Sequence, residues 1–172
     1  VHIYGLPVDI DPVLDLAKRY GLKIIEDAAE SLGATYKGKA SGTFGRLGVY
    51  SFNGNKIITT GGGGMILAND ALGVRAKHIT TTAKKPHPYE YVHDEVGYNY
   101  RLPNLNAALG CAQLEQLEAF IASKRELAAR YASLLKDTAL AFVAEPEHCR
   151  SNYWLNAVIC EDRQKRDALL TT

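Results

Sequence analysis

The sequence is poor in the residues that cross-link or anchor small proteins. Its 172 residues include three cysteines, Cys111, Cys149 and Cys160, an odd number without paired spacing. This pattern argues against a disulfide framework or a zinc ribbon, and His148 beside Cys149 lacks the second pair of ligands that a metal site needs. We therefore expect no metal, reduced thiols and a cytoplasmic protein.

Strong net charge and long apolar runs are also missing. A formal net charge of +1 gives no electrostatic reason to expect binding to nucleic acid or to an anionic membrane. No apolar run approaches the roughly 20 residues of a membrane span. What is present, 47% hydrophobic and 23% charged residues, is typical of a soluble globular protein. The length suffices for one domain with a core and the start of a second.

The two ends of the sequence predict that the chain is part of a longer polypeptide. Val1–Tyr4 already has the pattern of a strand and lacks an initiator methionine. Ala168–Thr172 has the pattern of a helix that is cut short.

Short apolar runs alternate with amphipathic segments along the chain. Asp11 is expected to cap a helix that has Pro12 in its first turn and ends at Gly21, and a strand follows at 22–26. A strand–helix–strand unit is typical of open α/β sheets, whose ligands bind beyond the carboxyl ends of the strands. Further strands are expected at 48–52, 64–68 and 154–160, helices at 71–80, 104–117 (capped by Asn104) and 120–136, and loops at 33–48 and 81–103.

Two polar stretches at strand ends are the most informative part of the sequence. Glu26–Ser31 follows one apolar run, and Ser51–Lys56 begins at the end of the next strand and leads into the glycine run Gly61–Gly64. Together they supply a carboxylate, a hydroxyl, a lysine and a permissive backbone. Pyridoxal 5'-phosphate needs such a set, because an anion faces its ring nitrogen, donors hold its phosphate and an amine meets its aldehyde. The two stretches, in this order, predict a pyridoxal phosphate site.

Three residues of these stretches have predicted roles at the cofactor, and for each residue a simpler, non-functional interpretation is also possible. Lys56 is predicted to bind the aldehyde and to carry a proton during the reaction, although most lysines in turns are merely solvated. Asp27 is predicted to keep the ring nitrogen protonated, although Asp at a strand end often caps a helix. Ser51 is predicted to donate to the phosphate, although serine also ends strands without a ligand.

With these residues in place, the sequence resembles the DegT/DnrJ/EryC1/StrS family of sugar-nucleotide aminotransferases. The matching motifs are Val1–Gly5, Glu26–Ser31 with Gly33 and Ala34, Ser51 and Phe52 before Lys56, Gly97–Arg101, Ala107–Gly110, and Gln113 with Leu114. They occur in the family's order and cover nearly the whole chain.

The resemblance implies an α/β fold in two parts. Residues 1–117 would form the C-terminal part of the large, cofactor-binding domain of a fold-type I pyridoxal phosphate-dependent transferase, with a mainly parallel sheet and flanking helices. Residues 118–172 would form a connecting helix and the start of a small α/β C-terminal domain. The resemblance also implies a homodimer whose sites are shared across the interface.

The activity implied by the resemblance is transfer of an amino group onto a nucleotide-linked 4-keto-6-deoxysugar. Glutamate would be the usual donor and become 2-oxoglutarate, and pyridoxamine phosphate would carry the amino group between the two half-reactions. Residues 80–89 look most like enzymes that make nonulosonic, legionaminic-type or other 4-amino sugars. This implies a role in cell-surface polysaccharide or lipopolysaccharide biosynthesis.

Further site residues follow from the resemblance. Asn99 matches an asparagine that reaches the cofactor phosphate of the partner subunit. Glu30 stands near the cofactor hydroxyl group, where many relatives have glutamine or histidine, so its contact stays open. Lysine at position 56, where some relatives carry histidine and catalyse dehydration, favours transamination. Candidate substrate-binding residues are Tyr98, Tyr100, Arg101 and His87, with His93 a weaker candidate, and each is equally compatible with packing.

Two other functions stay open on the sequence. Another fold-type I enzyme, such as a lyase or a cysteine desulfurase, is disfavoured because no cysteine lies in a suitable loop. A non-catalytic relative that binds the cofactor or only a partner is disfavoured by Lys56 and Asp27 but favoured by the incomplete chain. Since the family's upstream half normally supplies a ring-stacking aromatic residue and more phosphate donors, the isolated chain is expected to hold part of a working site.

Overall fold

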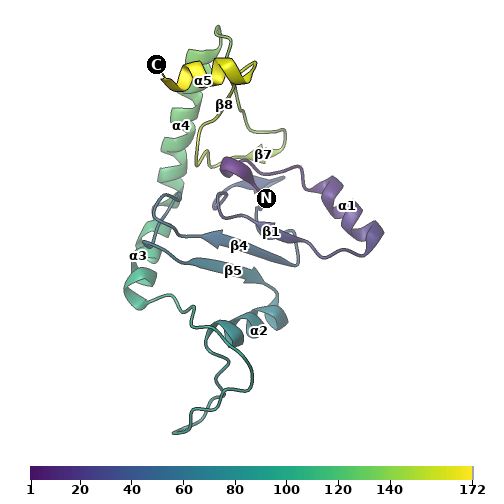
Figure 1. Ribbon diagram of the computed structural model, residues 1–172, viewed down its shortest axis with the longest axis vertical. Coiled ribbons are helices and arrows are strands. Elements are labelled where there is room, and N and C mark those ends of the chain that lie inside the picture. Colours follow the sequence, from purple (N-terminus) through teal and green to yellow (C-terminus); the bar gives the residue numbers. More distant parts are fainter. Residues whose placement is uncertain (172) are drawn as a thin grey trace.

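The computed structural model describes residues 1–171, which fold around a small central sheet (Figure 1). The helices are η1 (Ile3–Gly5, a 3₁₀ turn), α1 (Asp11–Tyr20), α2 (Asp70–Thr80), α3 (Asn104–Leu114), α4 (Leu117–Leu135) and α5 (Arg163–Thr171). The strands are β1 (Ile25–Asp27), β2 (Thr35–Tyr36), β3 (Lys39–Ala40), β4 (Leu47–Ser51), β5 (Gly64–Ala68), β6 (Ala141–Phe142), β7 (Cys149–Arg150) and β8 (Val158–Ile159). In Figure 1, α1 flanks the sheet, α2 lies beside β5, and α3 and α4 form a column along the opposite side.

The central sheet has the strand order β1–β4–β5. Strand β1 runs parallel to β4, with Asp27 opposite Val49, whereas β4 runs antiparallel to β5, with Ser51 opposite Gly64. The expected α/β class is confirmed, and the described sheet is mixed. Because β1 and β4 are parallel, their carboxyl ends lie at the same edge, and this edge carries Asp27 and Ser51.

A buried carboxylate fixes the loop that crosses this sheet. Glu26 is only 3% exposed and accepts hydrogen bonds from the amides of Gly42, Phe44 and Gly45 and from His2 Nε2. Burial raises the pKa of the Glu26 carboxyl, but these hydrogen bonds outweigh burial and leave the pKa below its ordinary value of 4.5. Glu26 thus anchors the 42–45 loop on β1.

Two small sheets complete the fold. The hairpin of β2 and β3 pairs with β7, so that the order is β3–β2–β7, and β6 pairs with β8. Ile121 and Ala128 are the buried residues of α4. No helix within residues 1–171 combines the length and the apolar character needed to cross a bilayer.

Several expected elements match the structure closely. Helix α1 ends where Gly21 adopts a φ of +65° and its amide donates to Ala17 O, as a C-terminal glycine should. Strand β5 has the expected bounds, 64–68. Helix α2 covers the expected 71–80 and begins one residue earlier, because the Asn69 side chain accepts from the Leu72 amide as its cap.

Other expectations were wrong. Asp11 is the first residue of α1 rather than its cap, since Ile10 stands at the cap position and no side-chain hydrogen bond caps this end. Val1–Tyr4 is not a strand, because Tyr4 has a φ of +57° and the chain turns through η1. The 33–48 segment is not all loop, since it contains the β2–β3 hairpin. Asn104 is the first residue of α3 rather than its cap, and α3 ends at Leu114. Of the expected strand at 154–160, only Val158–Ile159 is extended and paired.

Candidate functional site

Lys56 lies in the turn that follows β4 and is held between two side chains. Its amide donates to Asn53 O, which closes the turn. Its Nζ is 3.8 Å from Glu30 Oε1 and 4.1 Å from the centroid of the Trp154 ring. The Lys56 side chain is only 13% exposed. An amine with a carboxylate on one side and an aromatic face on the other is confined rather than solvated.

Asp27 and Ser51 occupy the ends of β1 and β4 at this same edge. Asp27 is exposed, and its Oδ1 accepts from the Ala29 amide at 3.1 Å. Ser51 Oγ accepts from the Asn53 amide at 3.3 Å. Within residues 1–171, no hydrogen bond or ion pair joins Asp27 or Ser51 to Lys56. Asp27 and Ser51 each accept a hydrogen bond from a backbone amide two residues on, and the carboxylate and the hydroxyl keep further hydrogen-bonding capacity.

Glu30 connects Lys56 to the N-terminal turn. Its Oε2 accepts from the Tyr4 amide at 2.7 Å, and its Oε1 faces Lys56. Its main-chain carbonyl accepts from Asn152 Nδ2 at 3.0 Å. The carboxylate thus already has a donor and a cationic neighbour within the chain.

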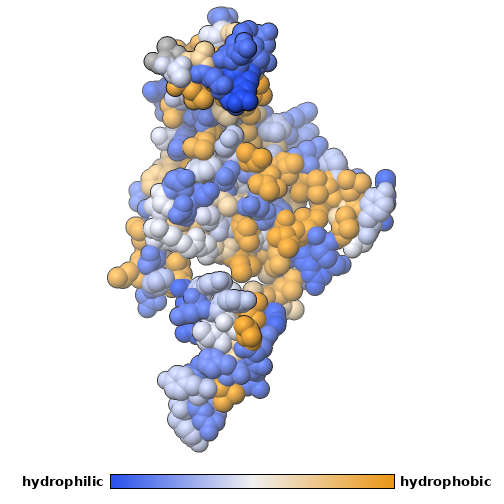
Figure 2. All heavy atoms as spheres, in the orientation of Figure 1, coloured by the Kyte–Doolittle hydropathy of each residue, from blue (hydrophilic) through white to orange (hydrophobic). Residues whose placement is uncertain are grey.

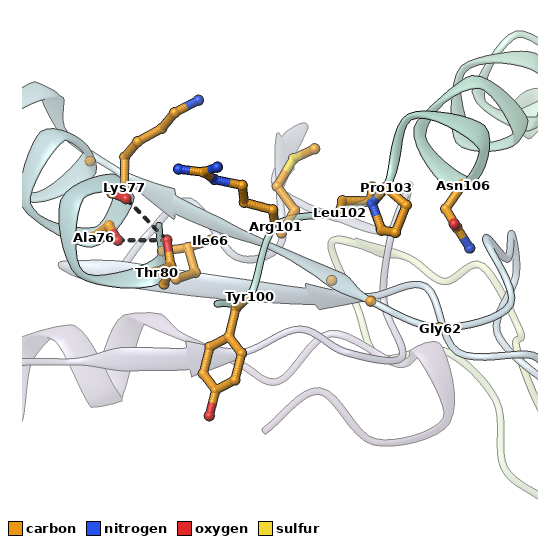
Figure 3. A pocket seen from close by; sticks show the side chains of 14 residues that line it. Gly62, Ile66, Ala76, Lys77, Thr80, Tyr100, Arg101, Leu102, Pro103 and Asn106 are labelled. Carbon is orange, nitrogen blue, oxygen red and sulfur yellow. Dashed lines mark hydrogen bonds between the residues drawn. The ribbon is translucent and has the colours of Figure 1, made fainter. Parts of the chain in front are cut away.

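A cavity of about 780 Å³ opens beside β5 and contains two of the predicted substrate residues. It is lined by the glycines at the start of β5, by the inner face of α2 and by Tyr100, Arg101, Leu102, Pro103 and Asn106. Figure 3 shows Arg101 and Lys77 extending to the same side, whereas Tyr100 points the other way. Neither Lys56 nor Asp27 lines this cavity. The predicted cofactor residues and these two substrate candidates therefore lie at different places within one chain.

The remaining predicted residues belong to the long 81–103 loop. Asn99 pairs with Thr81 through an isolated bridge, and the rings of Tyr98 and Tyr100 stack with centroids 5.3 Å apart. His87 packs edge-on against Tyr89 and accepts from the Glu90 amide at 2.8 Å. These contacts are local to the loop, and none of them reaches Lys56.

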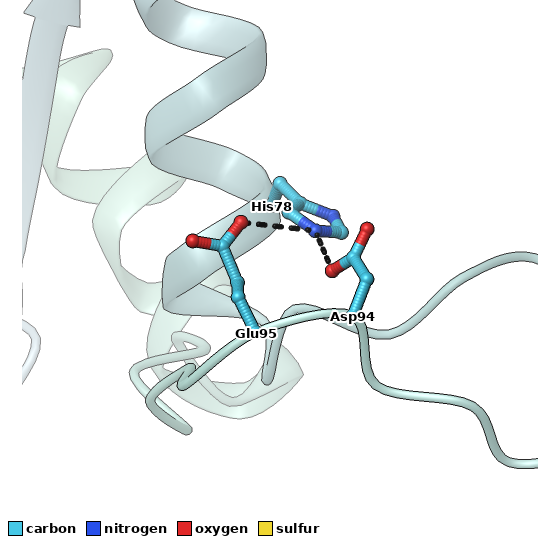
Figure 4. A group of neighbouring side chains, drawn as sticks. All are labelled: His78, Asp94 and Glu95. Carbon is cyan, nitrogen blue, oxygen red and sulfur yellow. Dashed lines mark hydrogen bonds and ion pairs between the residues drawn. The ribbon is translucent and has the colours of Figure 1, made fainter.

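A second polar group ties this loop to α2. Asp94 and Glu95 of the loop surround His78, whose Nε2 is 2.7 Å from Asp94 Oδ1 and 3.6 Å from Glu95 Oε1 (Figure 4). The His78 hydrogen bond lowers the pKa of Asp94, and the pairing with Arg75 lowers the pKa of Glu95. His78, Asp94 and Glu95 have the donor types of a metal site, with ligand atoms within 4.8 Å of one another. Glu95 already pairs with Arg75, and such exposed groups are common without an ion.

The cysteines do not resemble catalytic nucleophiles. Cys149 Sγ donates to Pro7 O at 3.5 Å, and burial raises the pKa of its thiol. A reactive cysteine needs the opposite shift, toward thiolate. Cys111 is an exposed residue of helix α3 rather than of a loop.

A carboxylate, a hydroxyl and a confined amine at the carboxyl edge of an α/β sheet match the donor set that pyridoxal phosphate requires. The fold is that of the fold-type I pyridoxal phosphate-dependent transferases. It superposes on an aminotransferase, TlmJ from Streptoalloteichus hindustanus, with a TM-score of 0.92 and 30% sequence identity, over 98% of this chain and 46% of that one. Another similar structure is Helicobacter pylori PseC, an aminotransferase involved in the biosynthesis of pseudoaminic acid (TM-score 0.90, 26% identity, 99% of this chain and 46% of that one).

The chain belongs to the DegT/DnrJ/EryC1/StrS aminotransferase family, whose profile matches residues 1–172. The GDP-perosamine synthase of Escherichia coli O157:H7 is 42% identical over 170 residues, which are 98% of this chain and 46% of that enzyme. The chain therefore spans about half the length of the curated relatives it matches.

Two residues at the site were missed at the sequence level. Trp154 was assigned to a strand, and the sequence holds no local signal that its ring lies over Lys56. Asn152, fully buried between Glu30 and Trp154, was not singled out. The buried role of Glu26 had one signal, a carboxylate at the end of the apolar run 22–25.

Proposed function

We propose that this chain is part of a pyridoxal phosphate-dependent aminotransferase that moves an amino group from glutamate to a nucleotide-linked 4-keto-6-deoxysugar. The observation that carries the proposal is the carboxyl edge of the central sheet, where Asp27 and Ser51 end the parallel strands β1 and β4 and the confined Lys56 lies in the turn after β4. Membership of the aminotransferase family supports it. The name of the 42% identical relative makes a GDP-linked amino sugar the first product to test.

When bound, the cofactor supplies a carbonyl that an amine can attack and a ring that accepts electrons from the substrate carbon. Asp27 would hold the proton on the ring nitrogen, and Ser51 would donate to the phosphate. Lys56 would bind the carbonyl carbon. Once released, its Nζ would carry the proton between the substrate carbon and the cofactor. The carboxylate of Glu30, 3.8 Å away, would keep this amine oriented toward the edge.

The proposal extends to the oligomeric state, the cellular location, the substrate-binding residues, the domain division and the use of the product. The proposed enzyme is a cytoplasmic homodimer in which Asn99 of one copy reaches the phosphate site of the other; within the chain, Asn99 pairs with Thr81. Tyr98, Tyr100, Arg101 and His87 bind the sugar nucleotide. Residues 1–117 belong to the large domain and 118–172 to the connecting helix and small domain. The product serves cell-surface polysaccharide, including lipopolysaccharide, with nonulosonate synthesis as a narrower assignment.

Replacing the proposed nucleophile tests the function directly. Purified full-length protein loaded with pyridoxal phosphate should show a yellow absorbance band that Lys56→Ala abolishes, and amine transfer from glutamate should fall by more than about a thousandfold. The control is Lys84→Ala, which removes a half-buried loop lysine that also lies over an aromatic ring and should keep both properties. Identical spectra for wild type and Lys56→Ala would refute the assignment of this lysine. A normal band without transfer to any nucleotide ketosugar would refute the substrate class.

A further inference from the structure

One indole holds two consecutive residues of the catalytic turn. The Trp154 ring face lies 4.1 Å from Lys56 Nζ, and its Nε1 donates to Asn55 O at 2.6 Å. Trp154 is itself only 7% exposed. The contact spans from the turn after β4 to the C-terminal part of the chain, so it joins two segments that are distant in sequence.

Asn152 holds the backbone of Trp154 in place. Asn152 Oδ1 accepts from the Trp154 amide at 2.8 Å, while its Nδ2 donates to the carbonyls of Glu30 and Leu32. Asn152 is fully buried, and Gly5 makes room for it: a Cβ on Gly5 would lie 1.8 Å from Asn152 Oδ1. The backbone of Trp154 is therefore held by contacts that do not involve Lys56, while its ring is held by the hydrogen bond to Asn55 O.

Lysine side chains have many rotamers, and a catalytic amine must be confined to one region to react efficiently. Glu30 and Trp154 approach Lys56 Nζ from two different segments. A carboxylate attracts an ammonium from any direction, whereas a ring face favours a cation placed over it. The indole thus supplies the directional part of the confinement.

We propose that Trp154 is a positioning residue for Lys56, holding the amine at the carboxyl edge of the sheet where the cofactor carbonyl is to be met. The expected effect on attachment of the cofactor rests on the proposed function, whereas the contact between Trp154 and Lys56 does not. The C-terminal segment 151–154 is by this inference a structural part of the cofactor site.

The test compares Trp154→Leu, which removes the ring, with Trp154→Phe, which keeps a smaller ring but loses the N–H. Full-length protein labelled with ¹³C at the lysine ε-carbons is examined without cofactor, and the Lys56 signal is assigned with Lys56→Arg. We expect the Lys56 ε-protons to be shifted upfield by the indole in wild type, less so in Trp154→Phe, and not at all in Trp154→Leu. The rate at which pyridoxal phosphate attaches to Lys56, measured by borohydride trapping and mass spectrometry, should fall about tenfold in Trp154→Leu and far less in Trp154→Phe.

The matched control is Tyr91→Leu, which removes the ring beneath Lys84 Nζ in the exposed loop and should change neither the Lys56 signal nor the attachment rate. An unchanged Lys56 signal or an unchanged attachment rate in Trp154→Leu would overturn the proposal. If Trp154→Leu does not fold, a Lys56 signal in Trp154→Phe identical to wild type would overturn it. If wild type attaches no pyridoxal phosphate, the proposed function fails, while the Lys56 signal still decides whether Trp154 positions the amine.

Discussion

Two glutamates separated by three residues have different tasks in this chain. Glu26 points into the protein, where three backbone amides and His2 satisfy it, whereas Glu30 points toward Lys56. A buried carboxylate with four donors holds structure together, because each donor would lose its partner if the charge were removed. A carboxylate beside a confined amine instead sets the position of that amine.

Glu26 should therefore make stability depend on pH. The pKa of Glu26 in the folded protein lies below its ordinary value of 4.5. The contribution of Glu26 to stability is therefore fully present above pH 4.5 and is lost as the pH falls through the folded pKa. Glu26→Gln should lower the free energy of unfolding by about 2–4 kcal/mol at pH 7, because an amide nitrogen would face the donors. Below pH 4.5, the variant should lose less stability than wild type. Urea denaturation across this pH range measures both effects.

The control for this experiment is Glu126→Gln, at an exposed residue of α4 that pairs with Arg130. It should change the unfolding free energy by less than about 0.5 kcal/mol. If Glu26→Gln had the same free energy of unfolding as wild type at pH 7, the role assigned to Glu26 would be contradicted.

At the residue scale, the sequence predicted positions better than partners. The sequence predicts Asp27 and Ser51 at strand ends and Lys56 in the turn that follows, because strand patterns and polar stretches are local features. The contacts of Lys56 were not predicted, since Glu30 reaches it across a turn and Trp154 reaches it from the other end of the chain. Such contacts depend on how distant segments pack against one another, and the periodicity of apolar residues carries no information about this packing.

At the scale of elements, strand β4 depends on a close backbone approach. A Cβ on Gly48 would lie 1.9 Å from the carbonyl oxygen of Gly42, in the loop that Glu26 anchors. Because the obstacle is backbone rather than a flexible side chain, the strand or the loop would have to move. The 42–45 loop can therefore pack on the sheet only if residue 48 has no side chain.

Gly48→Ala should destabilise the protein by more than about 3 kcal/mol or prevent folding. The control is Gly54→Ala, because a Cβ at Gly54 meets nothing within 4 Å. Thermal unfolding followed by circular dichroism should show a large drop in Tm for the first variant and almost none for the second. Equal Tm values for the two variants would show that the loop yields without cost.

Elements with a strong local pattern were predicted well. Helix α1 has Pro12 in its first turn and Gly21 past its end, and β5 is an apolar run bounded by glycine and Asn69. Elements without such a pattern were missed: the β2–β3 hairpin has only two residues per strand, and η1 depends on the positive φ of Tyr4. The expected strand at 154–160 failed at its start because Trp154 packs inward instead of pairing.

At the scale of the whole molecule, the described chain leaves much apolar surface uncovered. Ile25 on β1 is 66% exposed, Met65 and Ile66 on β5 are about half exposed, and Leu16 and Leu22 are exposed around α1. Figure 2 shows apolar atoms gathered on the side of the molecule where α1 lies. Exposed apolar area of this extent is unusual for a folded monomer and is normally covered by further protein.

Residues 1–172 produced alone should therefore associate. Sedimentation velocity should show a mass that rises with concentration, and a hydrophobic dye should bind with strong fluorescence. The full-length protein, measured in parallel, should bind much less dye per chain. If residues 1–172 formed a monodisperse monomer that binds no dye, the exposed apolar residues of β1, β5 and α1 would not require burial by further protein.

The hydrogen bond between Trp154 and Asn55 joins residues 99 positions apart. During translation, Lys56 therefore emerges from the ribosome well before its aromatic neighbour has been synthesised. A nascent chain ending before residue 154 already contains Lys56 and Glu30 but lacks the indole that lies over the amine. The surroundings of Lys56 are thus complete only after residue 154 has been synthesised, and premature termination after α4 would release a product whose Lys56 amine is held by Glu30 alone.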